Sequence, residues 1–282
     1  MRVIAHLSDL HFGRVDHAIL EPLRIAVRDL EPHAVVISGD LTQRAKAREF
    51  REARAYLDTL PGPQIVVPGN HDVPLYNVVK RFFAPLDNYR RYISDELEPT
   101  HIDDEMAIVG INTARSLTFK GGRINESQVA QVREKLCDLK GHMAKIVVTH
   151  HPFDIPETWD HDHIVGRARM AMRTLAACGA DLLLAGHAHM SHAGDTTARY
   201  KIDGYAALVV QAGTATSTRA RGETNSFNAL RIDGPDIQVE RHSWNEQTRA
   251  FELARSERFR HTAHGWQRGD SDGSANGEGL PR

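Results

Sequence analysis

The chain has 282 residues, of which 41% are hydrophobic and 26% charged, and its formal net charge is −2. This length suffices for one large domain with a sizeable core, and the near-neutral charge gives no general attraction to nucleic acid or to an anionic membrane. The sequence has no apolar stretch of about 18 residues, the length that a membrane-spanning helix needs, so we expect no membrane partner.

The first half of the chain alternates strand and helix patterns. Short apolar runs at 3–7, 34–37 and 65–67 predict three strands. Between them, apolar residues recur every three or four positions at 17–30 and 50–60, which is typical of amphipathic helices. This alternation predicts a parallel sheet covered by helices.

The segment 73–99 breaks the alternation with a run of aromatic and basic residues. We interpret it as a mostly helical insertion beside the functional site, and Arg81 within it is a candidate substrate contact. Ordinary packing with a charged outer face explains such a run equally well.

The next part of the chain returns to strands and helices. Apolar runs predict three buried strands, at 106–111, 146–149 and 182–185. One helix is expected to begin at Asn125, where Gln128 can complete a capping pair, and a second helix covers 167–178.

The C-terminal third shows a different pattern. Runs at 206–211, 226–232 and 237–243 predict consecutive strands of a second, largely antiparallel sheet packed on the first. From 261 to 282 the chain is polar and aperiodic, so we expect a disordered C-terminal tail. No repeat or linker divides the remainder, which predicts a single domain over 1–260.

The two cysteines, Cys137 and Cys178, are interpreted as inert buried thiols, because they lie in helix-like stretches and match no metal-ligand spacing. Unpaired thiols are typical of reducing compartments. The apolar run at the N-terminus is too short for a signal peptide. Together these features predict a cytoplasmic protein.

Five short motifs, each directly after a predicted strand, supply carboxylate, imidazole and amide groups. They read Asp9-Leu10-His11, Gly39-Asp40, Gly69-Asn70-His71-Asp72, His150-His151-Pro152 and Gly186-His187-Ala188-His189. In open α/β sheets, ligand groups gather outside the carboxyl ends of the strands, so we expect these side chains to meet at one edge. Each motif alone also fits an ordinary turn or a surface histidine. Their joint order favours a functional site.

These residue types indicate a metal site. Carboxylate oxygens and imidazole nitrogens without thiolates suit Mn, Fe, Zn or Co, and argue against a structural zinc ion. Two such ions about 3.5–4 Å apart can hold both the attacking and the leaving oxygen of an in-line displacement at phosphorus. An ion pair of this kind needs a bridging carboxylate, and Asp40, after a glycine turn, is a natural source.

The combined motifs resemble those of the calcineurin-like metallophosphoesterase superfamily over roughly residues 2–245. The resemblance implies an α/β fold, a four-layer α-β-β-α sandwich of two mixed sheets flanked by helices, with a dinuclear metal site at the strand C-terminal ends. It also implies two divalent ions, which would be Mn, Fe or Zn. The implied ligands are Asp9, His11 and His189 for the first ion, Asn70, His150 and His187 for the second, and Asp40 between them.

The resemblance also implies roles around the metals. A bridging hydroxide would attack phosphorus, and His71 would contact the phosphate and stabilise the transition state or assist the leaving group. Asp72 would support His71 or its loop, so both are catalytic candidates. His151 is expected near the substrate. Three other histidines are interpreted as solvated loop residues: His161, His163 and His192.

Departures from the family patterns narrow the choice of branch. Ser/Thr protein phosphatases continue Gly-Asp with Asp-Arg-Gly and end the next motif in Asn-His-Glu, and the hydrolases of lipid A synthesis carry Asn-Arg-Asp. This chain has Leu41 after Gly-Asp and reads Asn-His-Asp at 70–72. Double-strand-break repair nucleases continue into a large DNA-binding cap, which this length and charge do not supply. The chain is most similar to bacterial class III cyclic-nucleotide phosphodiesterases and glycerophosphodiesterases.

We therefore expect a metal-dependent phosphodiesterase that hydrolyses small phosphodiesters, with 3′,5′-cyclic AMP as the leading candidate. This choice rests on analogy, because one metal core serves many substrates. A phosphomonoesterase of the same superfamily and a nuclease on short or single-stranded nucleic acid are alternatives, and salt-sensitive DNA binding would identify the nuclease. A binding scaffold that has lost its chemistry is disfavoured, because every expected ligand position and His71 are filled.

Overall fold

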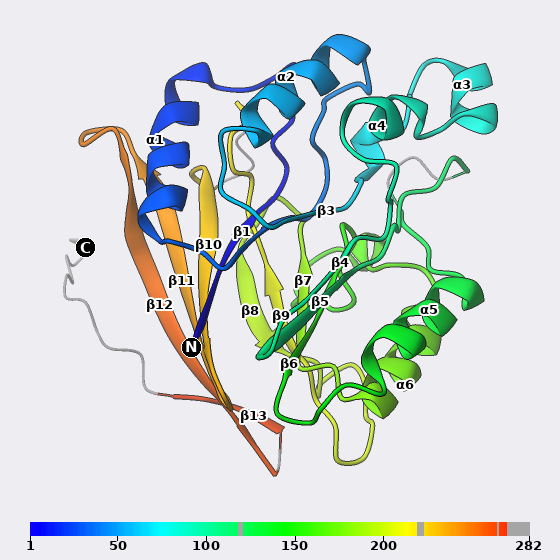
Figure 1. Cartoon of the computed structure of the whole chain (residues 1–282), viewed down its shortest axis with the longest axis vertical. Coiled ribbons are helices and arrows are strands. Elements are labelled where there is room, and N and C mark those ends of the chain that lie inside the picture. Colours follow the sequence, from blue (N-terminus) through cyan, green and yellow to red (C-terminus); the bar gives the residue numbers. More distant parts are fainter. Residues whose placement is uncertain (118–120, 219–222, 264, 270–282) are drawn as a thin grey trace, which may run out of the picture.

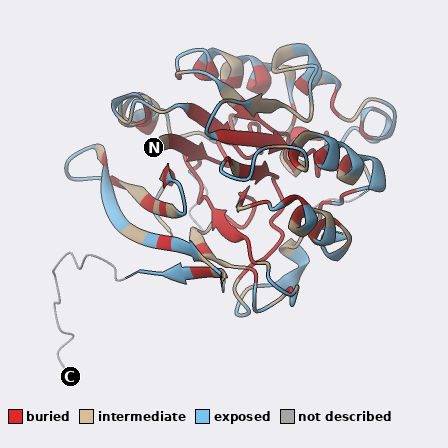
Figure 2. Cartoon of the chain, turned by 60° about the horizontal axis from the view of Figure 1, so that its bottom comes forward, coloured by how far each residue is buried: buried red, intermediate tan, exposed pale blue. Residues whose placement is uncertain are grey.

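Two mixed β-sheets pack face to face, and helices cover the outer face of each (Figure 1). The structure is a computed structural model that describes residues 1–117, 121–218, 223–263 and 265–269. Buried residues concentrate in the sheets, at the centre of the molecule (Figure 2). This arrangement is the four-layer α/β sandwich that the resemblance to the calcineurin-like superfamily implied.

The first sheet has seven strands among the described residues, in the order β13-β12-β11-β10-β1-β2-β3. Along the chain they are β1 (Arg2–Leu7), β2 (Ala34–Ile37), β3 (Gln64–Val66), β10 (Ser226–Asp233), β11 (Asp236–Asn245), β12 (Ala250–Thr262) and β13 (Gly265–Arg268). β1, β2 and β3 are parallel, whereas β10 to β13 join antiparallel. The loops after β1, β2 and β3 therefore leave the same edge of the sheet.

The second sheet has the order β4-β5-β6-β7-β9-β8 over the described part of the chain. Its strands are β4 (Thr100–Ile102), β5 (Met106–Gly110), β6 (Ala144–Val148), β7 (Leu182–Ala185), β8 (His192–Asp195) and β9 (Leu208–Gln211). The four central strands β5, β6, β7 and β9 are parallel, and antiparallel β4 and β8 form the edges. The loops after β6 and β7 again leave one edge.

The helices follow the predicted alternation with the strands. They are α1 (His17–Asp29), α2 (Ala47–Leu57), α3 (Val78–Phe83), α4 (Asp87–Tyr92), α5 (Glu126–Leu136) and α6 (Ala168–Cys178), with short 3₁₀ turns η1 (Asn70–Asp72) and η2 (His161–His163). The predicted capping pair forms at α5, because the Asn125 side chain accepts from the Gln128 N–H (2.9 Å) and Gln128 Oε1 accepts from the Asn125 N–H (3.0 Å). Within the described ranges, no helix is long and apolar enough to cross a membrane.

Side chains on each strand alternate between two apolar layers. On β1, Ile4 faces the second sheet, and Leu7 packs with the residues of α1 and α2. On β6, Val148 faces the first sheet, and Val147 packs with α5 and α6. Strands that are buried on both faces read as continuous apolar runs, which explains why the sequence located them well.

The predicted second antiparallel sheet of C-terminal strands is wrong. β9 instead pairs in parallel with β7 inside the second sheet. β10 pairs with β1, so β10 and the strands after it extend the first sheet. Local periodicity identifies a strand, but its partner is set by contacts with distant parts of the chain.

Part of the segment predicted as a disordered tail, 261–282, belongs to β-strands. β12 continues to Thr262 and pairs with β13, which runs from Gly265 to Arg268. Residues 270–282, the rest of the predicted tail, lie outside the described residues. The error arose because charged residues interrupt β12 and because β13 has only four residues, so neither strand shows a clear apolar run.

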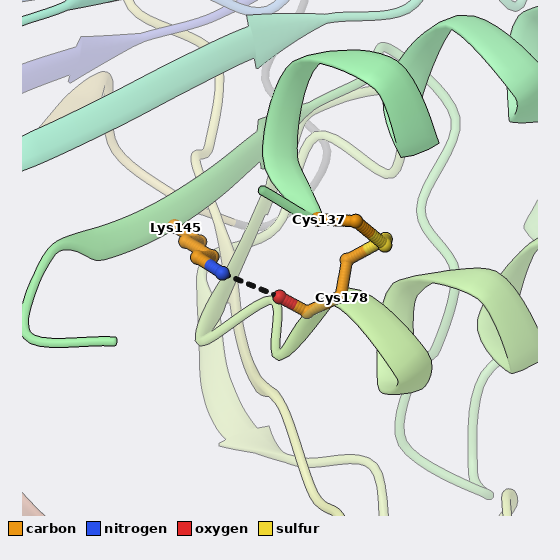
Figure 3. Close-up of a disulfide and its surroundings, with 3 residues drawn as sticks. All are labelled: Cys137, Lys145 and Cys178. Atoms are coloured by element: carbon orange, nitrogen blue, oxygen red, sulfur yellow. Dashed lines mark hydrogen bonds between the residues drawn. A yellow bond between two sulfur atoms is a disulfide. The ribbon is translucent and has the colours of Figure 1, made fainter. Parts of the chain in front are cut away.

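The interpretation of Cys137 and Cys178 as thiols is also wrong. A disulfide joins them, and each lies at the C-terminal end of a helix, α5 or α6 (Figure 3). The Cys178 carbonyl oxygen accepts a hydrogen bond of 2.8 Å from Lys145 Nζ on β6. Disulfides are typical of oxidising compartments, so the cysteines do not support a cytoplasmic location.

Candidate dinuclear metal centre

The seven predicted metal ligands come from the ends of five strands and meet at the edge where the two sheets adjoin. They are Asp9 and His11 after β1, Asp40 after β2, Asn70 after β3, His150 after β6, and His187 and His189 after β7. All except Asn70 are more than nine-tenths buried. The structure thus brings together side chains that are up to 180 positions apart in the sequence.

The backbone turns sharply at most of these positions. Asp9, His11 and Asp40 have positive φ values of 54°, 51° and 54°. His187 and His189 also have positive φ values, of 71° and 59°. Residues other than glycine occupy this left-handed region rarely, although Asp and His enter it more often than most. Such conformations are concentrated at functional sites, where the surrounding structure holds them.

Two motif glycines let the loops approach one another closely. A Cβ atom at Gly69 would overlap Oδ1 of Asp40, and one at Gly186 would overlap Oγ of Ser8. Glycine therefore allows the loop after β3 to contact the loop after β2, and the loop after β7 to contact the loop after β1.

The first donor group consists of Asp9, His11 and His189. Oδ1 of Asp9 lies 3.4 Å from Nε2 of His11 and 3.3 Å from Nε2 of His189. The two Nε2 atoms are 3.4 Å apart. Ligand atoms about 2.0–2.2 Å from a tetrahedral metal ion are roughly 3.3–3.6 Å from one another, so this triangle has the size of one face of a coordination shell. Oδ1 of Asp9 is buried and accepts no hydrogen bond from the described residues.

The second donor group consists of Asn70, His150 and His187. Nε2 of His150 lies 3.0 Å from Oδ1 of Asn70 and 3.2 Å from Nδ1 of His187. Nε2 of His187 is buried without a hydrogen-bond partner in the described part of the chain. Nitrogen and amide-oxygen donors at these spacings again fit a divalent ion.

The Asp40 carboxylate lies between the two donor groups. Its Oδ1 atom is 3.4 Å from Nε2 of His150, and its Oδ2 atom is 3.8 Å from Nε2 of His11. Oδ2 is buried and has no hydrogen-bond donor among the described residues, whereas Oδ1 accepts from the backbone N–H of His71 at 2.8 Å. One carboxylate therefore offers an oxygen to each donor group.

The second ring nitrogen of three of these histidines is fixed by a neighbouring group. Nδ1 of His150 lies 2.8 Å from the Ser38 carbonyl oxygen, and Nδ1 of His189 lies 2.8 Å from Oγ1 of Thr214. Nδ1 of His11 is 3.4 Å from the Thr42 carbonyl oxygen. Such contacts orient a metal-binding imidazole and fix its tautomer. Sequence reasoning missed Thr214 because no motif contains it.

The electrostatics of the site favour a positive charge. Burial acts to raise the pKa of Asp9, but the nearby imidazoles, led by His189, hold it well below its ordinary value. The same balance, with His150 as the leading imidazole, lowers the pKa of Asp40. Burial acts to lower the pKa of His11, yet Asp9 and Asp40 together raise it. Two ionised carboxylates in a buried site require a cation nearby.

His71 lies beside the donor groups and is half-buried. Its ring centre is 5.0 Å from that of His11, and its Nδ1 atom is 3.0 Å from the Gln43 carbonyl oxygen. The other ring nitrogen, Nε2, is therefore the atom that can reach a bound molecule.

Asp72 lies away from the donor groups, and its carboxylate joins two loops. It accepts hydrogen bonds from the backbone N–H groups of Gly69 (2.9 Å), Leu41 (3.2 Å) and Thr42 (2.9 Å). The Thr42 hydroxyl donates to it as well, at 3.0 Å. Of its two expected roles, this geometry favours support of the loop that carries His71.

His151 and His163 differ from their predicted surroundings. His151 is fully buried, with Nδ1 2.8 Å from Oγ1 of Thr113, and it lies close enough to His150 and His187 for the three imidazoles to hold one metal ion. Its ring centre is 4.4 Å from that of His187. His163 was interpreted as a solvated loop residue, but its ring centre lies 5.0 Å from that of His187. Both residues therefore border the second donor group.

Arg81 does not have the position of a substrate contact. Its side chain is buried, and it donates to the backbone carbonyl oxygens of Ser116 (2.6 Å) and Pro74 (3.0 Å). These bonds join α3 to the chain before and after it. The predicted substrate role of Arg81 is therefore corrected to a structural one.

Sequence comparisons match this chain to one protein family and to two bacterial relatives. A family model described as calcineurin-like phosphoesterase matches residues 2–191. The chain is 31% identical over 163 residues to glycerophosphodiester phosphodiesterase GpdQ from Enterobacter lignolyticus, a match that covers 53% of this chain and 56% of the relative. A probable glycerophosphodiester phosphodiesterase GpdQ from Arcobacter nitrofigilis is 24% identical over 182 residues, covering 60% and 65%. The chain thus spans less than two thirds of the length of either relative.

The fold is also found in a solved structure. Purple acid phosphatase PPD1 from yellow lupin seeds superposes with a TM-score of 0.68 at 11% sequence identity, over 91% of this chain and 53% of the other. At this identity the likeness concerns the fold alone. It agrees with the two packed sheets and their flanking helices.

Proposed function

The chain belongs to the calcineurin-like phosphoesterase family, and we propose on this basis that it is a metal-dependent phosphodiesterase that hydrolyses small phosphodiesters. The donor atoms at the strand ends support the metal dependence, because they are of the types and spacings that divalent ions use. The names of the two bacterial relatives support phosphodiesters as the class of substrate.

The proposal places two divalent ions in the site. The ligands are Asp9, His11 and His189 for one ion and Asn70, His150 and His187 for the other, with Asp40 shared between them. Mn, Fe and Zn all suit a mixture of carboxylate, imidazole and amide donors.

The position of Asp40 is the single observation that carries the proposal. Its carboxylate directs one oxygen toward each donor group, an arrangement that a site for one ion would not need. Two divalent ions held at such a carboxylate would supply the activation of water and the neutralisation of charge on the phosphoryl oxygens. The chain itself supplies the buried surroundings that exclude bulk water and hold the donor atoms in place.

His71 is the residue proposed to touch the substrate. Because Nδ1 is occupied by Gln43, Nε2 faces the site, and in the imidazolium form both nitrogens donate hydrogen bonds. Nε2–H would then bind a phosphoryl oxygen or transfer its proton to the departing alcohol oxygen. Asp72 acts indirectly, as a positioning residue for the His71 loop.

Two named substrates follow from this proposal. The relatives' names favour glycerophosphodiesters, and 3′,5′-cyclic AMP remains the candidate that the sequence motifs favour. Both contain a phosphate esterified at two oxygens, so the same site can act on either.

The test is a substrate panel on protein that has been stripped of metal by chelation and reloaded separately with Mn, Fe or Zn. The panel contains bis-p-nitrophenyl phosphate, p-nitrophenyl phosphate, cyclic AMP, glycerophosphodiesters and single-stranded DNA. Metal-dependent hydrolysis of the diesters above that of the monoester supports the proposal. Preference for the monoester, cleavage of DNA alone, or no hydrolysis with any ion would refute it.

A further inference from the structure

The apolar layer between the two sheets ends before the metal centre, where a row of polar side chains replaces it. Ile4, Leu230 and Val239 pair across β1, β10 and β11 and belong to the apolar layer. The next row on the same face, two residues nearer the metal centre, consists of His6, Asn228, Arg241 and Arg255 on β1, β10, β11 and β12. Residues two apart on a strand share a face, so this row also faces the second sheet.

A cavity of about 200 Å³ lies against this polar row. Both sheets contribute to its lining, which includes Arg241, Arg255, Arg268, Gln211 and Asn228. None of these residues belongs to the two donor groups of the metal centre. The lining carries three guanidinium groups and one carboxylate, that of Glu257, so its charge favours an anion.

The charges beside the cavity are not balanced. One oxygen of Glu257 lies 3.0 Å from both Arg255 and Arg268, and Glu223 lies 3.2 Å from Arg241. Among the residues that the structure describes, three guanidinium groups therefore pair with two carboxylates. Arg241 and Arg255 also occupy directly opposite positions on antiparallel strands, where like charges destabilise each other. A bound anion would relieve this repulsion.

Two buried polar atoms of the lining residues lack hydrogen-bond partners among the described residues. Nε of Arg241 is a donor without an acceptor. Gln211 is fully buried, and its Nε2 atom donates to the Asp154 carbonyl oxygen at 2.7 Å, which leaves Oε1 as an acceptor without a donor. A ligand that satisfies both atoms must offer acceptor oxygens together with a hydroxyl proton.

We propose that this cavity binds a phosphate group that keeps one proton, either free hydrogen phosphate or the end group of a small phosphomonoester. Its anionic oxygens accept from Arg241, Arg255 and Arg268, because a guanidinium group donates in a planar fork that matches phosphate. Its P–OH group donates to Oε1 of Gln211. Sulfate has a similar shape but carries no proton near neutral pH, so it cannot make the last bond.

The test is equilibrium binding of radiolabelled phosphate to the metal-loaded full chain. Three proteins are compared: the wild type, the double variant Arg255→Gln/Arg268→Gln and the control variant Arg260→Gln. The side chains of Arg255 and Arg268 are 60% and 50% exposed, so their replacement leaves the core intact. Arg260 lies on the same strand and pairs with Asp236, away from the cavity. Phosphate bound at the metal centre contributes equally in all three proteins.

We expect the double variant to bind one phosphate per chain about ten- to hundred-fold more weakly than wild type, the range for losing charge-assisted hydrogen bonds. Arg260→Gln should match wild type. Equal binding by the three proteins, or no phosphate bound in wild type beyond the metal centre, would overturn the proposal.

Competition experiments identify the chemistry and the source of the phosphate group. Sulfate should compete about tenfold less well than phosphate, because it lacks the proton for Gln211. Equal competition by sulfate would contradict the assigned ligand. Ethylphosphonate, whose C–P bond is not hydrolysed, distinguishes the two sources. If ethylphosphonate competes as well as phosphate does, the cavity accepts the end group of a phosphomonoester. If it competes less well, the ligand is free phosphate.

Discussion

The carboxylate of Asp40 and the imidazole of His150 meet across the boundary between the two sheets, with Oδ1 of Asp40 3.4 Å from Nε2 of His150. Asp40 follows β2 in the first sheet, and His150 follows β6 in the second. The other oxygen of Asp40 faces His11, which follows β1. One side chain thus contacts both donor groups, and its removal should affect both ions.

Replacing Asp40 with alanine should remove metal and activity together. We expect loss of bound metal, measured by elemental analysis, and at least about a hundredfold loss of phosphodiesterase activity, since even a residue that only orients a metal ligand contributes 10–100-fold. Asp58→Ala, which removes an exposed carboxylate at the end of α2, is the control. An Asp40→Ala protein with its full metal content would contradict the shared-ligand role.

Replacing His71 with alanine should slow turnover without removing metal. We expect kcat to fall about 10²–10⁴-fold, the range for loss of a proton-transfer group, because Nε2 of His71 is the ring atom that can reach the substrate. The exposed His161→Ala is the control. If His71→Ala loses its metal, the residue is a ligand and the assigned role fails.

Replacing Thr214 with valine should weaken binding of the ion held by His189. The change keeps the side-chain shape but removes the hydroxyl 2.8 Å from Nδ1 of His189. We expect metal affinity to fall about 10–100-fold in competition with a chelator. Thr197→Val, at an exposed position, should leave the affinity unchanged. An unaltered affinity in Thr214→Val would show that the hydroxyl does not orient His189.

Reducing the disulfide should lower the stability of the fold. Cys137 and Cys178 are 41 positions apart, and a cross-link over such a loop contributes about 2–4 kcal/mol to the free energy of unfolding. Urea unfolding with and without reductant measures the effect. The Cys137→Ser/Cys178→Ser variant should match the reduced wild type, respond no further to reductant and keep its metal. Identical unfolding of oxidised and reduced wild type would contradict the expected contribution.

Local patterns in the sequence located most elements of the fold. The predicted strands at 34–37 and 182–185 have the same bounds as β2 and β7, because strands buried on both faces appear as continuous apolar runs. The start of α5 was found through the chemistry of its cap. The gathering of the motif side chains could be predicted because strand ends in such sheets lie at one edge, whereas the individual ligands were implied by the resemblance to the calcineurin-like superfamily.

Local sequence patterns could not predict contacts between residues that are far apart in the chain. The runs that form β9 and β10 were predicted as consecutive strands of one antiparallel sheet, yet they join different sheets. Cys137 and Cys178 gave no sign of pairing, because their contact depends on α5 and α6 ending side by side. Arg81 is an ordinary basic residue in sequence, and only its burial against backbone carbonyl groups shows its structural role.

The proposed ligands of each ion come from both layers of the β-sandwich. The first sheet supplies Asp9, His11, Asp40 and Asn70, and the second supplies His150, His187 and His189. Metal binding would then also join the two β-sheets at the end of the molecule that carries the site. Without its ions the protein would keep the apolar layer between the two sheets but lose the link that the shared ligands provide. The sheets should then separate first at the edge that carries the metal site.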